Sequence, residues 1–143
     1  MELHVTPMLA LLREHHLLDH VSNLTDFTAT DVSYDSRRVK QGTLFFCKGN
    51  FMPKYLAMAK DKGAIAYVAE QEYPEGQGLP AIIVKDEQKA MALLGAAFYG
   101  FPQNDLFIIA ITGTKGKTTT AYFADHILKQ STDDHVALFS TLD

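Results

Sequence analysis

Residues 108–120 read IIAITGTKGKTTT, an apolar run that breaks into a turn with two glycines and continues into a segment with the pattern of a helix. Glycines let the backbone N–H groups of such a turn approach an anion closely, and the start of the next helix adds roughly half a unit of positive charge. In this arrangement Lys117 reaches terminal phosphates and the Thr118 hydroxyl holds Mg²⁺. The stretch therefore predicts a phosphate-binding loop of the P-loop type.

The match to the P-loop pattern is partial. The full pattern has a further glycine five residues before Gly116, where this chain has Ile111, so only the core GxxGKT is present. The context agrees with the mechanism, because residues 106–111 have strand character and residues 118–130 carry an apolar stripe at helical spacing. The alternative is an ordinary glycine turn with a solvated lysine.

Composition and charge narrow the class of protein. The chain has 143 residues, of which 47% are hydrophobic and 21% charged, as in a globular domain of ordinary size. Its net charge is −4 and its 13 basic residues are scattered, which argues against a nucleic-acid partner. No apolar run approaches the roughly 18 residues of a membrane helix, and the N-terminus lacks the pattern of an export signal. The single cysteine, Cys47, is expected to be a buried strand thiol, as suits a reducing compartment, and we expect a cytoplasmic location.

Apolar periodicity and turn residues outline an α/β chain. A first helix is expected to be capped at Thr6-Pro7 and to run to about Asp19. Strands are expected at 31–34, 43–47, 65–69 and 81–84, with one helix between Pro53 and Gly63 and another from the cap Asp86 to Gly100. Two further strands are expected at 106–111 and 136–139, on either side of the helix that follows the loop.

A domain boundary is expected at residues 100–105, which read GFPQND and stay polar until the next strand. It divides the chain into a first domain at 1–103 and the start of a second domain at 104–143. The second part holds only strand, loop, helix and strand, and a parallel unit of this kind is normally covered by helices on both faces. We therefore expect the chain to be the front of a longer protein, and its exposed strands to favour self-association.

Several segments resemble the Mur ligase family, in sequence and in order. They read YDSRRV at 34–39, GTLFFCKG at 42–49, KGA at 62–64 and TGTKGKTT at 112–119. The DSR turn and the GTKGKTT loop are the most specific of these segments. The resemblance extends from about residue 32 to the end of the chain.

The resemblance implies a cytoplasmic enzyme of peptidoglycan synthesis that uses ATP and Mg²⁺ to join a free amino acid to UDP-MurNAc-L-Ala-D-Glu through an acyl phosphate. The fold class that it implies is α/β, with an N-terminal Rossmann-like UDP-substrate-binding domain followed by the first strand–P-loop–helix–strand of a P-loop ATPase domain. Tyr34, Ser36 and Asn50 would contact the UDP group. Lys117 would be catalytic at the β/γ-phosphate oxygens, and Thr118 would bind the magnesium. Carried over by position, the residues around the ATP phosphates are Gly113, Thr114, Lys115, Gly116, Lys117, Thr118 and Thr119.

The sequence leaves several alternatives open. From residue types alone, Asp35 and Ser36 are ordinary turn formers, and Arg37 could pair with Asp35 or lie in water. The segments SYDSRRV and FFCKG resemble lysine-adding members more than diaminopimelate-adding ones, but the family's specificity domain would lie beyond Asp143. The chain could instead be a stand-alone UDP-sugar or nucleotide-binding module, or part of a related ligase such as a folylpolyglutamate synthase. By itself the chain is expected to be inactive, because it lacks the later acidic Mg²⁺ ligand and the adenine site of the family.

Overall fold

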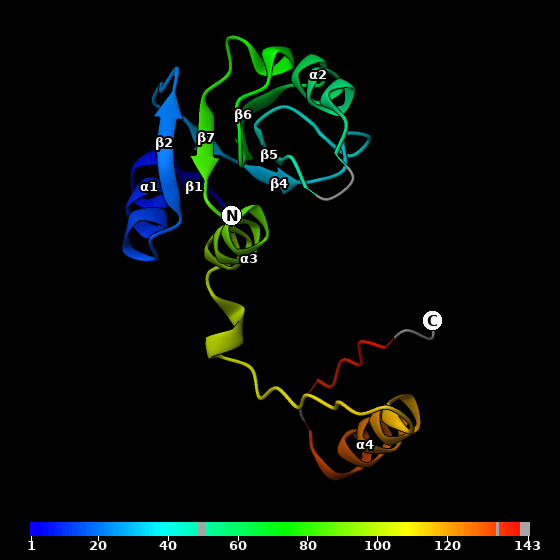
Figure 1. Cartoon of the computed structure of the whole chain (residues 1–143). Helices are drawn as coiled ribbons and strands as arrows, with labels where there is room; N and C mark the ends of the chain where they lie inside the picture. The colour runs from blue at the N-terminus through cyan, green and yellow to red at the C-terminus, as the bar shows by residue number, and fades with distance from the viewer. Residues whose placement is uncertain (49–50, 134, 141–143) are drawn as a thin grey trace. The chain divides into compact units, whose positions relative to one another are not determined.

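A computed structural model describes residues 1–48, 51–133 and 135–140 of the chain. It separates into two compact units, Met1–Asp105 and Leu106–Asp143 (Figure 1). The elements in chain order are β1 (Leu3–His4), α1 (Val5–Glu14), β2 (Leu18–Ser22), β3 (Thr28–Ala29), β4 (Asp31–Ser33), β5 (Thr43–Phe46), α2 (Pro53–Asp61), β6 (Ala64–Ala69), the 3₁₀ turn η1 (Pro74–Gly76), β7 (Ala81–Val84), α3 (Glu87–Phe98), the 3₁₀ turn η2 (Pro102–Asn104) and α4 (Lys117–Ser131).

The first unit is built on a five-stranded sheet with the order β2-β7-β6-β5-β4. Strands β4 to β7 are parallel neighbours, and β2 pairs antiparallel with β7 at one edge. The short strands β1 and β3 form a separate antiparallel pair. The parallel strands follow one another along the sheet in chain order, whereas a Rossmann sheet reverses its order at the ligand crevice. The mixed α/β class is therefore confirmed, but the Rossmann-like description is not.

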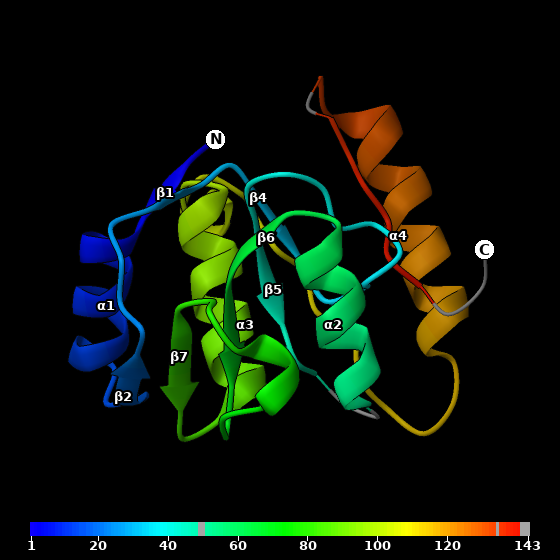
Figure 2. The same cartoon turned by 90° about the horizontal axis from the view of Figure 1, so that it is seen from above.

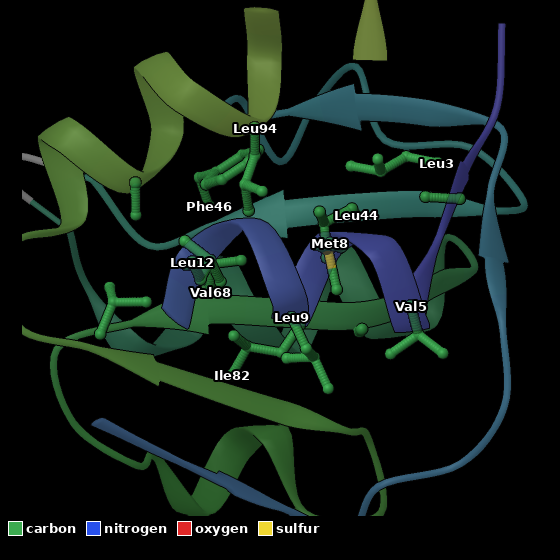
Figure 3. Close-up of a cluster of buried hydrophobic side chains, with 14 of the residues drawn as sticks. Leu3, Val5, Met8, Leu9, Leu12, Leu44, Phe46, Val68, Ile82 and Leu94 are labelled. Atoms are coloured by element: carbon green, nitrogen blue, oxygen red, sulfur yellow. The ribbon is translucent and has the colours of Figure 1, made fainter. Parts of the chain in front are cut away.

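One face of the sheet is covered by α1 and α3. Met8 and Leu12 of α1 and Leu94 of α3 are fully buried in one cluster with Leu44 of β5 and Val68 of β6 (Figure 3). Successive residues of a strand point to opposite faces of the sheet. If helices cover the second face too, the same strands must also be apolar on that face.

The second face is covered by α2. Leu56 and Ala59 of this helix are fully buried with Phe45 of β5, and Tyr67 and Ile83 of β6 and β7 are buried in the same cluster. Figure 2 shows α2 separated from α1 by the strands and α3. The strands are apolar on both faces, as expected for the parallel strands of an α/β sheet.

Turn residues set the ends of α2 and α3 as predicted. Pro53 is the first residue of α2, and Gly63 follows the helix with a φ of +101°. Asp86 caps α3, since its side chain accepts a hydrogen bond from the Lys89 backbone N–H at 3.0 Å. Gly100 follows α3 with a φ of +76°. The predicted limits of both helices are confirmed.

The first helix differs from the prediction at both ends. Its cap is His4 rather than Thr6, and the His4 ring accepts a hydrogen bond from the Thr6 N–H at 3.3 Å. The helix ends at Glu14 rather than near Asp19, because His16 takes a left-handed φ of +57°. Residues 18–22 then form β2, whose backbone pairs with β7. This pairing is a contact between distant segments, which local apolar spacing could not reveal.

The second unit has a single helix among its described residues, α4, which confirms the helix predicted at 118–130 to within one residue at each end. The strands predicted at 106–111 and 136–139 are wrong, because these two fully described ranges form no strand. A strand is stabilised by hydrogen bonds to a neighbouring strand, and the described part of this unit offers none. The predicted strand–P-loop–helix–strand order is thus reduced to a loop and a helix.

Candidate functional site

The loop before α4 has the backbone shape that its two glycines favour. Gly113 has a φ of +150°, and Gly116, the cap residue of α4, has a φ of +78°. The Thr120 N–H donates to the Gly116 carbonyl oxygen at 2.9 Å. The N–H groups of the first helical turn before Thr120 have no partner within the helix itself. These donors and the helix dipole make the start of α4 suitable for an anion.

Lys117 crosses this loop. Its Nζ donates a hydrogen bond to the Gly113 carbonyl oxygen at 2.6 Å. Residues 113–117 and Thr119 are exposed, and Thr118 is half-buried. The structure thus brings the predicted phosphate-binding residues, 113–119, together in one loop and helix start. Because these positions carry only glycine, threonine and lysine, their local charge is positive.

In the first unit, two predicted UDP-contacting residues lie where β4 ends. Tyr34 directly follows β4 and is 63% exposed. The Lys48 Nζ lies 5.1 Å from the centroid of the Tyr34 ring, in a cation–π contact. Ser36 lies two residues after Tyr34 and is only 5% exposed. Asn50, the third predicted residue, lies outside the described residues.

The turn that contains Ser36 is held by Asp35 and Arg37. The Arg37 guanidinium donates from Nε to Asp35 Oδ1 at 3.0 Å and from Nη2 to Oδ2 at 2.8 Å, and its backbone N–H donates to Oδ1 at 2.9 Å. These hydrogen bonds, the guanidinium ones first, lower the pKa of Asp35 to about 2. The Lys62 Nζ donates to the Arg37 carbonyl oxygen at 2.9 Å. Of the roles that the sequence left open for Arg37, pairing with Asp35 is the one observed.

Three charged residues lie near the same sheet edge and were not predicted as site residues. Lys48 follows β5 by two positions, Glu70 directly follows β6, and Glu87 opens α3 after β7. Carboxyl ends of parallel strands meet at one edge of a sheet, where ligands of α/β proteins bind. The only signal in the sequence was the position of these residues just after strand-like runs, and nothing else distinguished them from surface charges.

Neither a metal-binding cluster nor a membrane-spanning helix is present among the described residues. They contain no group of three or more His, Cys, Asp or Glu residues that could hold a metal ion. None of their helices is both long and apolar enough to span a bilayer. Cys47 is free and buried, and burial raises the pKa of its thiol, so the predicted buried thiol is confirmed.

Comparison with known proteins identifies the family. No protein-family model matches the chain. The UDP-N-acetylmuramyl-tripeptide synthetases of Limosilactobacillus reuteri and Ligilactobacillus salivarius are 89% and 66% identical to it over all 143 residues. The enzyme of that name from Lacticaseibacillus paracasei is 55% identical over 146 aligned positions that cover the whole chain. The chain belongs to the Mur ligase family.

This Mur ligase chain spans 28% of the length of each of these three relatives. Among solved structures, MurF from Acinetobacter baumannii matches with a TM-score of 0.61 and 23% identity, over 87% of this chain and 27% of that one. A UDP-N-acetylmuramoylalanyl-D-glutamyl-2,6-diaminopimelate–D-alanyl-D-alanyl ligase from the same organism matches with a TM-score of 0.59 and 23% identity, over 87% of this chain and 28% of its own. At this identity the likeness shows that the fold is shared with Mur ligase structures.

Proposed function

We propose that this chain is the N-terminal part of an ATP-dependent ligase that adds the third residue, L-lysine, to UDP-MurNAc-L-Ala-D-Glu in cytoplasmic peptidoglycan synthesis. The observation that carries the proposal is the 89% identity, over all 143 residues, with a relative named UDP-N-acetylmuramyl-tripeptide synthetase. Residues 1–103 would form the UDP-substrate-binding domain, and residues 104–143 would begin the ATP-binding domain. The substrates of the ligase would be the UDP-linked dipeptide and a free amino acid.

The loop residues fit the phosphates of a magnesium-bound ATP. Their threonine and lysine side chains and their backbone N–H groups can donate to phosphate oxygens, and none of these residues carries a carboxylate. Gly113 has a φ of +150°, a backbone conformation that residues with a side chain rarely adopt, so glycine suits this position of the loop. When bound, ATP supplies the phosphoryl group that turns the substrate carboxylate into an acyl phosphate, which the amine of the amino acid then attacks.

Lys117 and Thr118 would have different roles at the phosphates. The Lys117 ammonium, which lies against Gly113 in the loop, would hold the β/γ-phosphate oxygens and offset their charge. The Thr118 hydroxyl would bind the magnesium ion. Positioning and charge compensation of this kind are the main contributions that a protein makes to phosphoryl transfer.

Tyr34 and Ser36, at the sheet edge of the first unit, would contact the UDP group, and Asn50 is proposed as a third contact from its position in the sequence alone. The exposed ring of Tyr34 offers a flat apolar surface, and Lys48 beside it brings a positive charge. Ser36 would contact the ligand from the turn that Asp35 and Arg37 hold in shape. Lysine as the added amino acid rests on the resemblance of SYDSRRV and FFCKG to lysine-adding members of the family.

Two measurements test the proposal. In NMR titrations of the chain, UDP should shift the amide signals of Tyr34 and Ser36, and ATP with Mg²⁺ those of residues 113–119. The protein extended to the length of its relatives should then ligate lysine, and not diaminopimelate, to UDP-MurNAc-L-Ala-D-Glu. Ligation of diaminopimelate would overturn only the lysine assignment, and binding without ligation would favour a UDP-sugar or nucleotide-binding module. No response to either nucleotide would overturn the whole proposal.

A further inference from the structure

The carboxyl edge of the sheet in the first unit gathers side chains from four neighbouring strands. Tyr34 follows β4, Lys48 follows β5, Glu70 follows β6 and Glu87 opens α3 after β7. Glu87 differs from the others because it is buried: it is 5% exposed although its side chain is ionisable. Acidic residues are almost never fully buried unless their charge is paired.

The carboxyl group of Glu87 is not satisfied within the described residues. Its Oε1 atom is buried and has no hydrogen-bond partner there. The backbone N–H of the same residue, by contrast, donates to Glu70 Oε1 at 3.0 Å. The neighbouring carboxylate of Asp86 also has a partner, the Lys89 backbone N–H at 3.0 Å. A buried acceptor without a donor is unfavourable and rare, so it calls for a physical reason.

Charged residues near the same edge of the sheet act on Glu87. Burial raises its pKa most, Glu70 raises it further, Lys48 lowers it and Asp86 raises it. Glu87 in turn helps to raise the pKa of the Cys47 thiol. Cys47 and Lys48 both follow β5, whereas Glu87 follows β7, and β6 separates these strands. Glu87 therefore shares the carboxyl edge of the sheet with the Lys48–Tyr34 pair.

We propose that Glu87 is a further ligand-binding residue of this edge, where its free carboxyl oxygen accepts a hydrogen bond from an N–H or O–H group of the uridine part of the substrate. The inference rests on the proposed UDP-binding function. Glu70 and Asp86 place two more carboxylates at the same helix start, so a diphosphate is repelled from it and a neutral donor is favoured. Uridine carries such donors on both its base and its ribose.

The test compares two variants that each remove one negative charge from the start of α3. Glu87→Met keeps a side chain of similar length without carboxyl oxygens. Glu70→Gln is the matched control, because its amide oxygen can still accept from the Glu87 N–H. UDP, CDP and 2′-deoxy-UDP are titrated into the chain and both variants by calorimetry, and the Tyr34 amide signal is followed by NMR. CDP lacks the imide N–H of the base, and 2′-deoxy-UDP lacks one ribose hydroxyl, so the two analogues show which donor is used.

Glu87→Met should bind UDP about tenfold or more weakly than the unchanged chain, whereas Glu70→Gln should stay within about twofold. UDP affinity within twofold in Glu87→Met, with the Tyr34 signal still shifting, would overturn the role of Glu87 and leave the proposed function intact. Absence of any UDP response in the unchanged chain would overturn both. Should Glu87→Met fail to fold, Glu87→Gln replaces it: a neutral acceptor is a weaker partner, so a roughly three- to tenfold loss is expected and an unchanged affinity refutes the role.

Discussion

The Nζ of Lys117 lies 2.6 Å from the carbonyl oxygen of Gly113, so the lysine that follows the loop is tied to the glycine that begins it. A lysine ammonium has three N–H donors, and this bond uses one of them. The side chain is thereby held along the loop. This geometry lets the lysine reach oxygens that the backbone N–H groups of the loop also reach.

Removal of this lysine should weaken ATP binding. In Lys117→Ala the loss of a charge-assisted contact of about 1.5 to 3 kcal/mol corresponds to roughly a 10- to 100-fold lower affinity for ATP with Mg²⁺, measured by calorimetry. Lys129→Ala is the control, because it removes a positive charge from the other end of α4, where Lys129 pairs with Asp125 at 2.8 Å. Equal ATP affinity in Lys117→Ala and Lys129→Ala would contradict the assigned role.

The Asp35–Arg37 pair should make the turn at Ser36 sensitive to acid. The pKa of Asp35 is lowered to about 2 in the folded chain, below its ordinary value near 3.9. A lowered pKa adds stability above the unfolded value, and this stability is lost as the pH falls from about 4 to about 2. The carbon signal of the Asp35 carboxyl should titrate in this window. Arg37→Gln should return the Asp35 pKa toward its ordinary value, whereas Arg38→Gln should have little effect; the same titration curve in both variants would refute this account.

A second titrating contact joins β2 to the segment after β6. His20 lies between Asp19 Oδ2 at 2.8 Å and Glu72 Oε1 at 3.2 Å, and Ser22 also donates to Glu72. The hydrogen bonds to Asp19 and then to Glu72 raise the pKa of His20 above its usual 6.5. A raised pKa gives stability that is complete below pH 6.5 and is lost as the pH rises through the folded-state pKa.

We therefore expect Glu72→Gln to lower the pKa of His20, measured from its ring proton signals. Asp26→Asn serves as the control, because Asp26 pairs with His4 at 3.2 Å and not with His20. A His20 pKa that does not move in Glu72→Gln would show that the contact with Glu72 does not persist in solution.

The sequence predicted those features of the fold that depend on local residues, and it missed those that depend on contacts between distant segments. The limits of α2 and α3 were predicted because Pro53, Gly63 and Asp86 act on their own backbone. The end of α1 and the strand β2 were missed because they are decided by pairing with β7, which follows about sixty residues later. The apolar run at 106–111 has strand propensity without a partner strand in the described part of its unit.

The same distinction between local and distant features holds for the candidate site. The loop at 113–119 was predicted because its glycines and Lys117 have a fixed spacing. Glu87 was missed, because in the sequence it is an ordinary acidic residue in the first turn of a helix, where acids favour the dipole. Only the packing of the carboxyl edge shows that it is buried and lacks a partner for Oε1 among the described residues.

The glycine that closes α2 should tolerate no side chain. At Gly63 the φ is +101° and an added Cβ would lie 2.9 Å from the Gln41 Cα, so strain and a backbone clash add together. Gly78 has a similar φ of +88° with open space around it, and Gly78→Ala isolates the strain, about 1–2 kcal/mol. In urea unfolding, Gly63→Ala should lose clearly more stability than Gly78→Ala. Equal losses would mean that the loop carrying Gln41 moves aside at little cost.

Apolar side chains of the second unit remain in contact with solvent. Phe107 is 92% exposed and Phe139 is 94% exposed. Self-association through strand edges was predicted, but residues 106–111 and 136–139 form no strands, so any association should come from side-chain contacts. The chain should therefore show a mass that rises with concentration in light scattering, and Phe107→Ser combined with Phe139→Ser should reduce this rise. Leu24→Ser, at a 54% exposed position in the first unit, is the control and should change little. A concentration-independent monomer mass for the unchanged chain would contradict the prediction.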